Sequence, residues 1–141
     1  MTPSPTSIVQ RLYELFGAGR IDDTYALMSD GVVLHEPGDP ASIPWAGEFR
    51  GHAGLKRFYD GLASGLTSIE IDEGSLKFLE VEGNRVLVLG YERGVSARTG
   101  RTYTTSSAWL WEVHGGQITG LVAFHDTAAM LAAMTPSVGS A

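Results

Sequence analysis

The chain of 141 residues has no cysteine, which excludes disulfide bridges, thiolate nucleophiles and sulfur-ligated metal sites. Basic residues are few as well: 10 Lys and Arg stand against 16 Asp and Glu, and the net charge at pH 7 is -6. Nucleic-acid binding depends mainly on clustered Lys and Arg, and here these residues are scattered along the chain. We therefore expect no nucleic-acid partner.

Long apolar runs are missing too. No stretch approaches the roughly 20 residues that a helix needs to cross a bilayer, and the opening Met1–Pro5 lacks the basic flank and apolar run of a secretory signal. We therefore expect a cytoplasmic protein without membrane contact. Hydrophobic residues make up 43% of the chain and charged residues 18%, which is typical of a globular protein. The length fits a single domain over residues 1–141, with an ordered core over about residues 7–134 and loose termini.

The first half of the chain has the periodicity of helices. Ser7 followed by Gln10 is a capping-box pattern, and it predicts a first helix that ends near Gly17. A second, short helix is predicted from Asp22 or Asp23 to about residue 30, and a third helix is predicted after residue 51. Between them lie a short β-prone run at residues 32–34 and an irregular, aromatic loop with prolines.

From Ser68 onward apolar residues alternate with polar ones, which is typical of half-exposed antiparallel strands. Glycine-containing turns divide this half into a meander of hairpins. We therefore predict an α+β fold, in which a curved, mainly antiparallel sheet packs its concave face on three N-terminal helices and leaves an apolar pocket. The predicted strands cover residues 68–71, 75–81, 85–96, 102–113 and 117–126, and a last helix covers 127–134.

The runs Gly31–Gly38 and Trp45–Gly51, followed by Thr99–Arg101, Gly116–Ile118 and His125–Thr127, form an ordered set of motifs. This set resembles the SnoaL-like polyketide cyclases and the related ketosteroid isomerases of the nuclear transport factor 2-like superfamily. The resemblance implies a cone-shaped, cystatin-like α+β barrel with its active site inside the cone, and it implies a homodimer. It says less about the reaction, because the superfamily contains isomerases, epoxide hydrolases, dehydratases and members without catalysis.

Asp126 is the first candidate for catalysis. On a regular strand it shares its face with Ile118, Val122 and Phe124, which would put its carboxyl at the end of a buried apolar face. An apolar pocket raises the pKa of a carboxyl and lets it act as an acid or base, and the resemblance implies that role for the matching aspartate. A second interpretation stays open, because Asp126 also directly precedes the last predicted helix and could cap it.

His35 and Glu36 are the next candidates, and the alternation of strand side chains allows only one of them to face the pocket. We assign His35 as the second catalytic residue, a donor to the developing oxyanion, with a structural histidine as the alternative. An ungapped match to ketosteroid isomerase places Glu36 at that enzyme's general base, and Ser107 and Ala108 where its second acid lies. A full isomerase pair is therefore absent, and Glu36 is expected either at a solvated loop edge or beside the ligand.

The other binding candidates are aromatic, and they also fit a packed core. Trp45 stands out because it lies in an irregular loop, where functional residues are common. We expect His125 to face away from Asp126 unless a bulge intervenes, and Glu92 to form a surface ion pair with Arg93. No His-Glu-x-x-His type of spacing is present, so we expect no metal. The predicted ligand-binding residues are Tyr13, Trp45, Phe58, Tyr59, Trp109, Phe124 and Glu36.

Hypotheses from two classes of function follow. The leading one is a small, cofactor-independent enzyme of the SnoaL-like type that moves a proton on an apolar carbonyl compound. The ligand would be small and apolar, aromatic or polycyclic, and the reaction a cyclisation, isomerisation or dehydration. One alternative is water addition to an epoxide, with Asp126 activating the water. The other is a ligand-binding or dimerisation module without catalysis.

Overall fold

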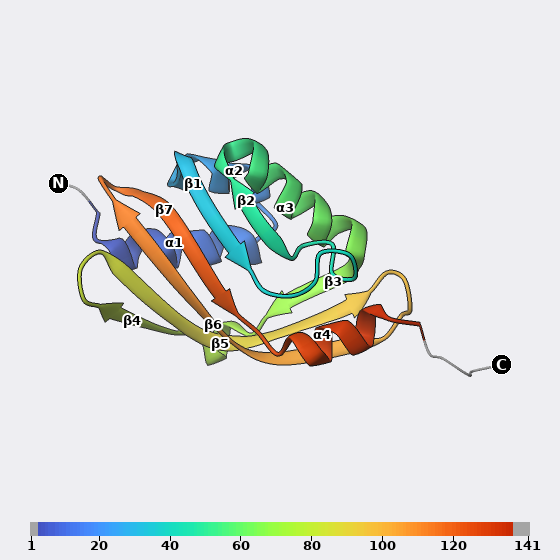
Figure 1. Cartoon of the computed structure of the whole chain (residues 1–141). Helices are drawn as coiled ribbons and strands as arrows, with labels where there is room; N and C mark the ends of the chain where they lie inside the picture. The colour runs from blue at the N-terminus through green and yellow to red at the C-terminus, as the bar shows by residue number, and fades with distance from the viewer. Residues whose placement is uncertain (1–2, 137–141) are drawn as a thin grey trace.

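The computed structural model describes residues 3–136, and its seven-stranded sheet wraps around the N-terminal helices (Figure 1). The helices are α1 (Pro5–Gly17), α2 (Ile21–Thr24), α3 (Gly51–Gly65) and α4 (Thr127–Met134), with short 3-10 turns η1 (Tyr25–Leu27) and η2 (Glu73–Ser75). The strands are β1 (Met28–Glu36), β2 (Gly47–Arg50), β3 (Leu66–Ile71), β4 (Lys77–Val81), β5 (Arg85–Ser96), β6 (Thr102–His114) and β7 (Gln117–Phe124).

Helix α1 begins earlier than the sequence pattern predicts. Ser4 is its N-cap and accepts a hydrogen bond from the backbone N–H of Ser7 at 3.1 Å. Pro5 follows in the first turn, where the missing N–H costs nothing. The predicted cap, Ser7, instead donates its hydroxyl to the Ser4 carbonyl oxygen at 2.9 Å, so the prediction of a cap at Ser7 is wrong.

The segment between α2 and α3 contains more strand than the sequence predicts. The predicted second helix ends early, because β1 starts at Met28 and runs for 9 residues. β2 lies in the segment expected to be an irregular loop, and it pairs antiparallel with β1, with Phe49 opposite Leu34. A short edge strand gives little local signal, because its hydrogen-bond partners lie elsewhere in the sequence.

The strand order is β2-β1-β7-β6-β5-β3, and β4 pairs with the first half of β5. Neighbours from β4 to β7 are antiparallel, which confirms the predicted meander of hairpins. β1 joins β7 in parallel, so the sheet is mixed. β5 and β6, of 12 and 13 residues, bend around the helices as long twisted strands do. The predicted α+β fold with a curved sheet is confirmed.

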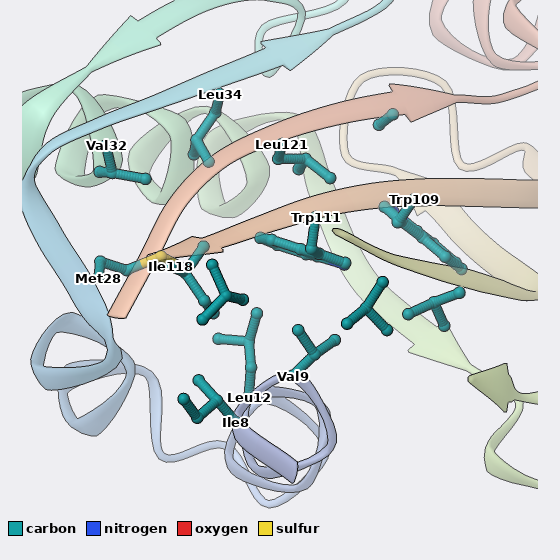
Figure 2. Close-up of a cluster of buried hydrophobic side chains, with 14 of the residues drawn as sticks. Ile8, Val9, Leu12, Met28, Val32, Leu34, Trp109, Trp111, Ile118 and Leu121 are labelled. Carbon is teal, nitrogen blue, oxygen red and sulfur yellow. The ribbon is translucent and has the colours of Figure 1, made fainter. Parts of the chain in front are cut away.

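Helix α1 closes one end of the concave face of the sheet. Figure 2 shows Ile8, Val9 and Leu12 of α1 on the side of the helix that faces Trp111 and Ile118. All five side chains are buried. Burial of each such side chain stabilises the fold by about 1.5–3 kcal/mol relative to exposure, so apolar packing stabilises this end.

A second apolar cluster closes the other end, where α3, α4 and the loop before β2 meet. Trp45 is buried there and stacks on Tyr103, with ring centroids 6.2 Å apart. Gly65 of α3 permits this approach, because a Cβ at that position would lie 2.9 Å from the Trp45 ring. Met130 and Met134 of α4 complete the cluster. Within residues 3–136, no helix is long and apolar enough to cross a membrane.

Candidate active site

A bulge in β7 decides which residues at the C-terminal end of the sheet face inward. Val113 of β6 pairs with Ile118 and Glu112 pairs with Gly120, so that Thr119 is left over as the extra residue. Beyond it the alternation is reversed. Val122 and Phe124 are 39% and 54% exposed on the convex face, so the prediction that they share the buried face of Ile118 is wrong.

Asp126 consequently lies outside the interior. Its side chain is exposed, and Oδ1 accepts a hydrogen bond from the Ala129 backbone N–H at 3.0 Å at the start of α4. Its backbone N–H donates to Thr105 Oγ1 at 2.7 Å. The predicted pocket position of Asp126 is wrong, and the capping interpretation describes what this residue does in the fold.

His125 takes the inward position that was expected for Asp126. Its Nε2 lies 3.3 Å from Oε2 of Glu36 at the end of β1, and both side chains are almost fully buried. Its Nδ1 lies 2.6 Å from Ser107 Oγ on β6. The Trp109 ring packs edge-on against the imidazole, with centroids 5.6 Å apart. Partners on two strands, β1 and β6, therefore fix the orientation of this histidine ring.

Glu92 brings a second carboxyl to the same cavity. The prediction that it forms a surface ion pair with Arg93 is wrong, because β5 directs Glu92 inward, where it is buried, and leaves Arg93 exposed. The Tyr103 hydroxyl donates to Glu92 Oε2 at 2.7 Å. The Tyr103 ring lies directly against Gly94, a position where any Cβ would collide with it. A glycine two residues along the strand thus makes room for the partner of Glu92.

One oxygen of each carboxyl is left for a ligand. The contacts from His125 and Tyr103 go to Oε2 of Glu36 and of Glu92 respectively. Among the described residues, no buried side-chain nitrogen or oxygen lacks a hydrogen-bond partner. Because Glu36 and Glu92 both line the cavity, their Oε1 atoms are open to it rather than sealed in protein.

Burial and mutual charge shift the pKa values of this cluster. Burial raises the pKa of Glu36, partly offset by its hydrogen bond with His125 and by the charge of that ring. Burial likewise raises the pKa of Glu92, against the lowering effects of His125 and Tyr103. For His125 burial lowers the pKa, but the hydrogen bond with Glu36 and the charges of both carboxyls outweigh it, so the pKa is raised. All three groups therefore bind their protons more tightly in the folded protein than in the unfolded chain.

The cavity that receives these groups has a volume of ≈ 70 Å³, several times the roughly 10–15 Å³ that a single water molecule needs. Its walls are otherwise apolar and aromatic. Along them lie Leu12, Tyr13, Phe16, Met28, Leu34, Glu36, Trp45, Leu55, Phe58, Tyr59, Leu62, Ile69, Ile71, Glu92, Trp109, Trp111, Leu121 and His125.

Tyr13 is the third polar group that can serve a ligand. Its hydroxyl oxygen accepts a hydrogen bond from Trp111 Nε1 at 3.0 Å, which leaves the hydroxyl hydrogen free to donate. Burial raises the pKa of Tyr13 well above its usual value, so the group stays protonated. Among the residues that the structure describes, no three His, Asp or Glu side chains come together in a way that could hold a metal ion.

Besides Asp126, two more of the predicted site residues lie away from the cavity. His35 is exposed on β1, next to Glu48 of β2 and Val122 of β7. Phe124 lies on the same convex face, so the predicted pocket positions of His35 and Phe124 are both wrong. The alternation rule did predict that only one of His35 and Glu36 faces inward, and Glu36 is that residue; the expectation of a solvated loop edge for it is wrong.

A family model for the SnoaL-like domain matches residues 9–121 of this chain. The chain belongs to the SnoaL-like family. An NTF2-like protein from Burkholderia xenovorans LB400 is 26% identical, with a TM-score of 0.82 over 96% of this chain and 98% of its own. TerC, co-crystallised with polyporic acid, is also 26% identical, with a TM-score of 0.80 over 93% of this chain and 98% of its own.

A protein of Xanthomonas campestris pv. campestris, provisionally assigned as a polyketide cyclase, has a similar structure. It is 20% identical, with a TM-score of 0.76 over 93% of this chain and 96% of its own, and at this identity the likeness shows the fold alone. No protein of curated function matches the chain. The SnoaL-like resemblance and the cystatin-like fold that it implied are confirmed.

Sequence reasoning missed most of the polar cluster of this SnoaL-like domain. His125, Ser107, Glu92 and Tyr103 were not candidates, because a regular strand would turn His125 outward and nothing local links the other three. One signal was available: Gly120 stands alone inside a strand pattern, which often marks a bulge. With a bulge at that point, the alternation predicts that His125, and not Asp126, faces the interior.

Proposed function

We propose that this SnoaL-like protein is a cofactor-independent enzyme that moves a proton on an apolar carbonyl compound, in a cyclisation, isomerisation or dehydration. The observation that carries the proposal is the buried Glu36–His125 pair, which faces an aromatic cavity with one carboxyl oxygen open to it. Glu36 and His125 replace Asp126 and His35 as the proposed catalytic pair, because the latter two lie outside the cavity lining.

In the proposed first step, Oε1 of Glu36 removes a proton from the carbon next to the carbonyl. The electrons of the broken C–H bond form the enolate, whose negative charge rests on the former carbonyl oxygen. Tyr13 and protonated Glu92 donate hydrogen bonds to that oxygen, in a cavity where water does not compete. His125 stabilises the carboxylate form of Glu36, and Ser107 holds the ring in place.

The second step returns a proton or releases a leaving group. In an isomerisation the Glu36 proton goes to another carbon of the enolate, and in a dehydration it goes to a departing hydroxyl. In a cyclisation the enolate carbon attacks a second carbonyl, whose π electrons move to its oxygen, and the alkoxide formed there takes the Glu36 proton. Two carboxyls with raised pKa values suit such transfers, because each holds a proton more readily than an exposed carboxyl does. TerC was co-crystallised with polyporic acid, which supports a small-molecule ligand. The epoxide alternative loses its support, since it relied on Asp126.

The proposal is tested with acetophenone in deuterated water, by following the loss of its methyl signal in proton nuclear magnetic resonance spectra. We expect the wild-type protein to accelerate exchange over buffer, and Glu36→Gln to lower this acceleration by about 100-fold or more. Asp126→Asn keeps a good helix cap and is expected to exchange like wild type.

Exchange that survives in Glu36→Gln but is lost in Asp126→Asn would restore the assignment drawn from the sequence. No acceleration by the wild-type protein would favour the ligand-binding module instead.

We also propose a cytoplasmic homodimer that associates through the convex face of the sheet. Tyr91 and Phe124, each 54% exposed, lie on this face with Val122, and half-buried apolar residues of β5 and β6 lie between and around them. An apolar patch of this kind on a sheet face favours association. Sedimentation velocity is expected to give twice the mass of the chain; a monomer at micromolar concentration contradicts the dimer.

A further inference from the structure

We infer that the binding site has two compartments and that its ligand is elongated, with a carbonyl-bearing ring in the inner cavity and an apolar arm in an outer groove. This inference rests on the proposed function, because it takes the inner cavity as the place of the reacting carbonyl. The groove is an open hollow of ≈ 540 Å³ between the end of α1, α2, α3 and β3.

The groove and the inner cavity share a wall, which is the main reason to treat them as one site. Phe16, Tyr59, Leu62 and Ile69 line both spaces. None of the four carries a charge, and they come from three different elements, α1, α3 and β3. We take the contact between these four side chains as the passage through which a ligand in the cavity would continue into the groove.

The passage also lies close to the proposed reaction centre. On β3, Ile69 pairs with Gly94 and Ile71 pairs with Glu92 of β5, and both isoleucines line the cavity. A carbonyl held by Glu92 thus has the passage beside it, while Trp109 and Trp111 of β6 supply aromatic surface to the same cavity. This order fits an aryl ketone whose alkyl chain leaves by the passage.

The polarity of the groove sets the chemistry of the arm. Apolar side chains such as Ile21, Ala63 and Leu66 form part of its lining, which favours methylene groups. Three charged residues line it as well: Asp22, and Lys56 and Asp60, whose Nζ and Oδ2 atoms form an exposed ion pair at 2.8 Å. Since Lys56 is paired with Asp60 and Asp22 adds a negative charge, the groove disfavours an arm that ends in a carboxylate.

The wall between the compartments is held in place by hydrogen bonds. The Tyr59 hydroxyl lies 2.6 Å from Thr24 Oγ1, which in turn donates to the Ile21 carbonyl oxygen at 2.6 Å. These contacts tie α3 to α2 beside the passage.

Binding of n-alkyl phenyl ketones tests the inference without any need for turnover. All three tryptophans of the chain, Trp45, Trp109 and Trp111, line the inner cavity, so quenching of their fluorescence reports its occupation. From acetophenone to hexanophenone we expect the dissociation constant to fall by up to about fourfold per added methylene. Ala63→Phe fills the groove and is expected to remove this gain while leaving acetophenone binding unchanged.

The matched control is Ala53→Phe, an exposed position on the same helix that lines neither compartment. It should keep the full dependence on chain length. Affinity that is flat across the ketone series, or a gain that survives in Ala63→Phe, overturns the two-compartment site. The proposed function can fail separately. If the Glu36→Gln protein still exchanges the acetophenone methyl protons, Glu36 is not the base, but the dependence of ketone affinity on chain length is unaffected. Absence of any ketone binding to wild type overturns both.

Discussion

The two ends of the concave sheet face are built from the same strands and both are buried, yet only the α4 end carries a polar cluster beside its apolar side chains. At the α1 end, β1, β5, β6 and β7 contribute Met28, Val88, Trp111 and Ile118. At the α4 end, β1, β5 and β6 contribute Glu36, Glu92 and Ser107, and His125 directly follows β7.

The difference teaches where stability and function reside in this fold. Burial of the apolar side chains at the α1 end stabilises the fold. The carboxyls and the imidazole at the α4 end lose their hydrogen bonds to water on burial, and hydrogen bonds to protein partners must replace them. The cluster around His125 is partnered on every side, by Glu36, Ser107 and the charge of Glu92. A buried polar cluster of this kind adds little to stability, and its presence beside a cavity points to chemistry.

Removing a large side chain from the α1 end is expected to have the largest effect. Trp111→Ala should lower the free energy of unfolding by about 3–5 kcal/mol, because it leaves a hole in the apolar cluster and removes the donor to Tyr13. Ser107→Ala at the α4 end should cost about 1 kcal/mol. Urea unfolding followed by circular dichroism measures both values. Equal losses in the free energy of unfolding from the two variants would contradict the proposed difference between the two ends.

A smaller effect, on the pH dependence of stability, should come from the α4 end alone. Glu36, Glu92 and His125 all have raised pKa values in the folded protein, so the folded state holds these protons more tightly than the unfolded chain. The stabilisation from these groups is fully present below their pKa values in the unfolded chain, 4.5 for Glu and 6.5 for His. It is lost as the pH rises through their pKa values in the folded protein. The free energy of unfolding should therefore fall as the pH rises above 4.5, and the part that comes from His125 should be lost only above 6.5.

A pair of variants separates this effect from the other titrating groups. Glu92→Gln cannot lose a proton, so its stability should fall less steeply over the same pH range. Val88→Ala, at the α1 end, should lower the free energy of unfolding by a similar amount at each pH. A Glu92→Gln slope as steep as that of wild type would show that Glu92 does not titrate abnormally.

The fold was largely predictable because its strongest signals are local. The bounds of β5 and α4 match the predicted residues 85–96 and 127–134, since turns and periodicity mark them directly. β2 and the early start of β1 were not predicted, because pairing between distant segments stabilises them. One extra residue, Thr119, was enough to reverse the predicted face of everything after it on β7.

The candidate site was predictable only in part. Glu36 and five aromatic residues of the predicted set line the cavity, as burial and the family resemblance suggested. Glu92 was missed because Arg93 follows it, and two adjacent opposite charges indicate an exposed ion pair unless the face of the strand is known. Ser107 and Tyr103 act through contacts across strands, which one sequence does not reveal.

The most direct test of the central claim, that Glu36 and His125 form one buried acid–base pair, is a pH titration of the His125 ring by nuclear magnetic resonance. If the two residues form such a pair, the His125 pKa lies above 6.5 in the wild-type protein. It is lower in Glu36→Gln, because burial still lowers it while one of the two carboxyls that raise it is gone. A wild-type ring that titrates below 6.5, or one whose pKa is unmoved by Glu36→Gln, contradicts it.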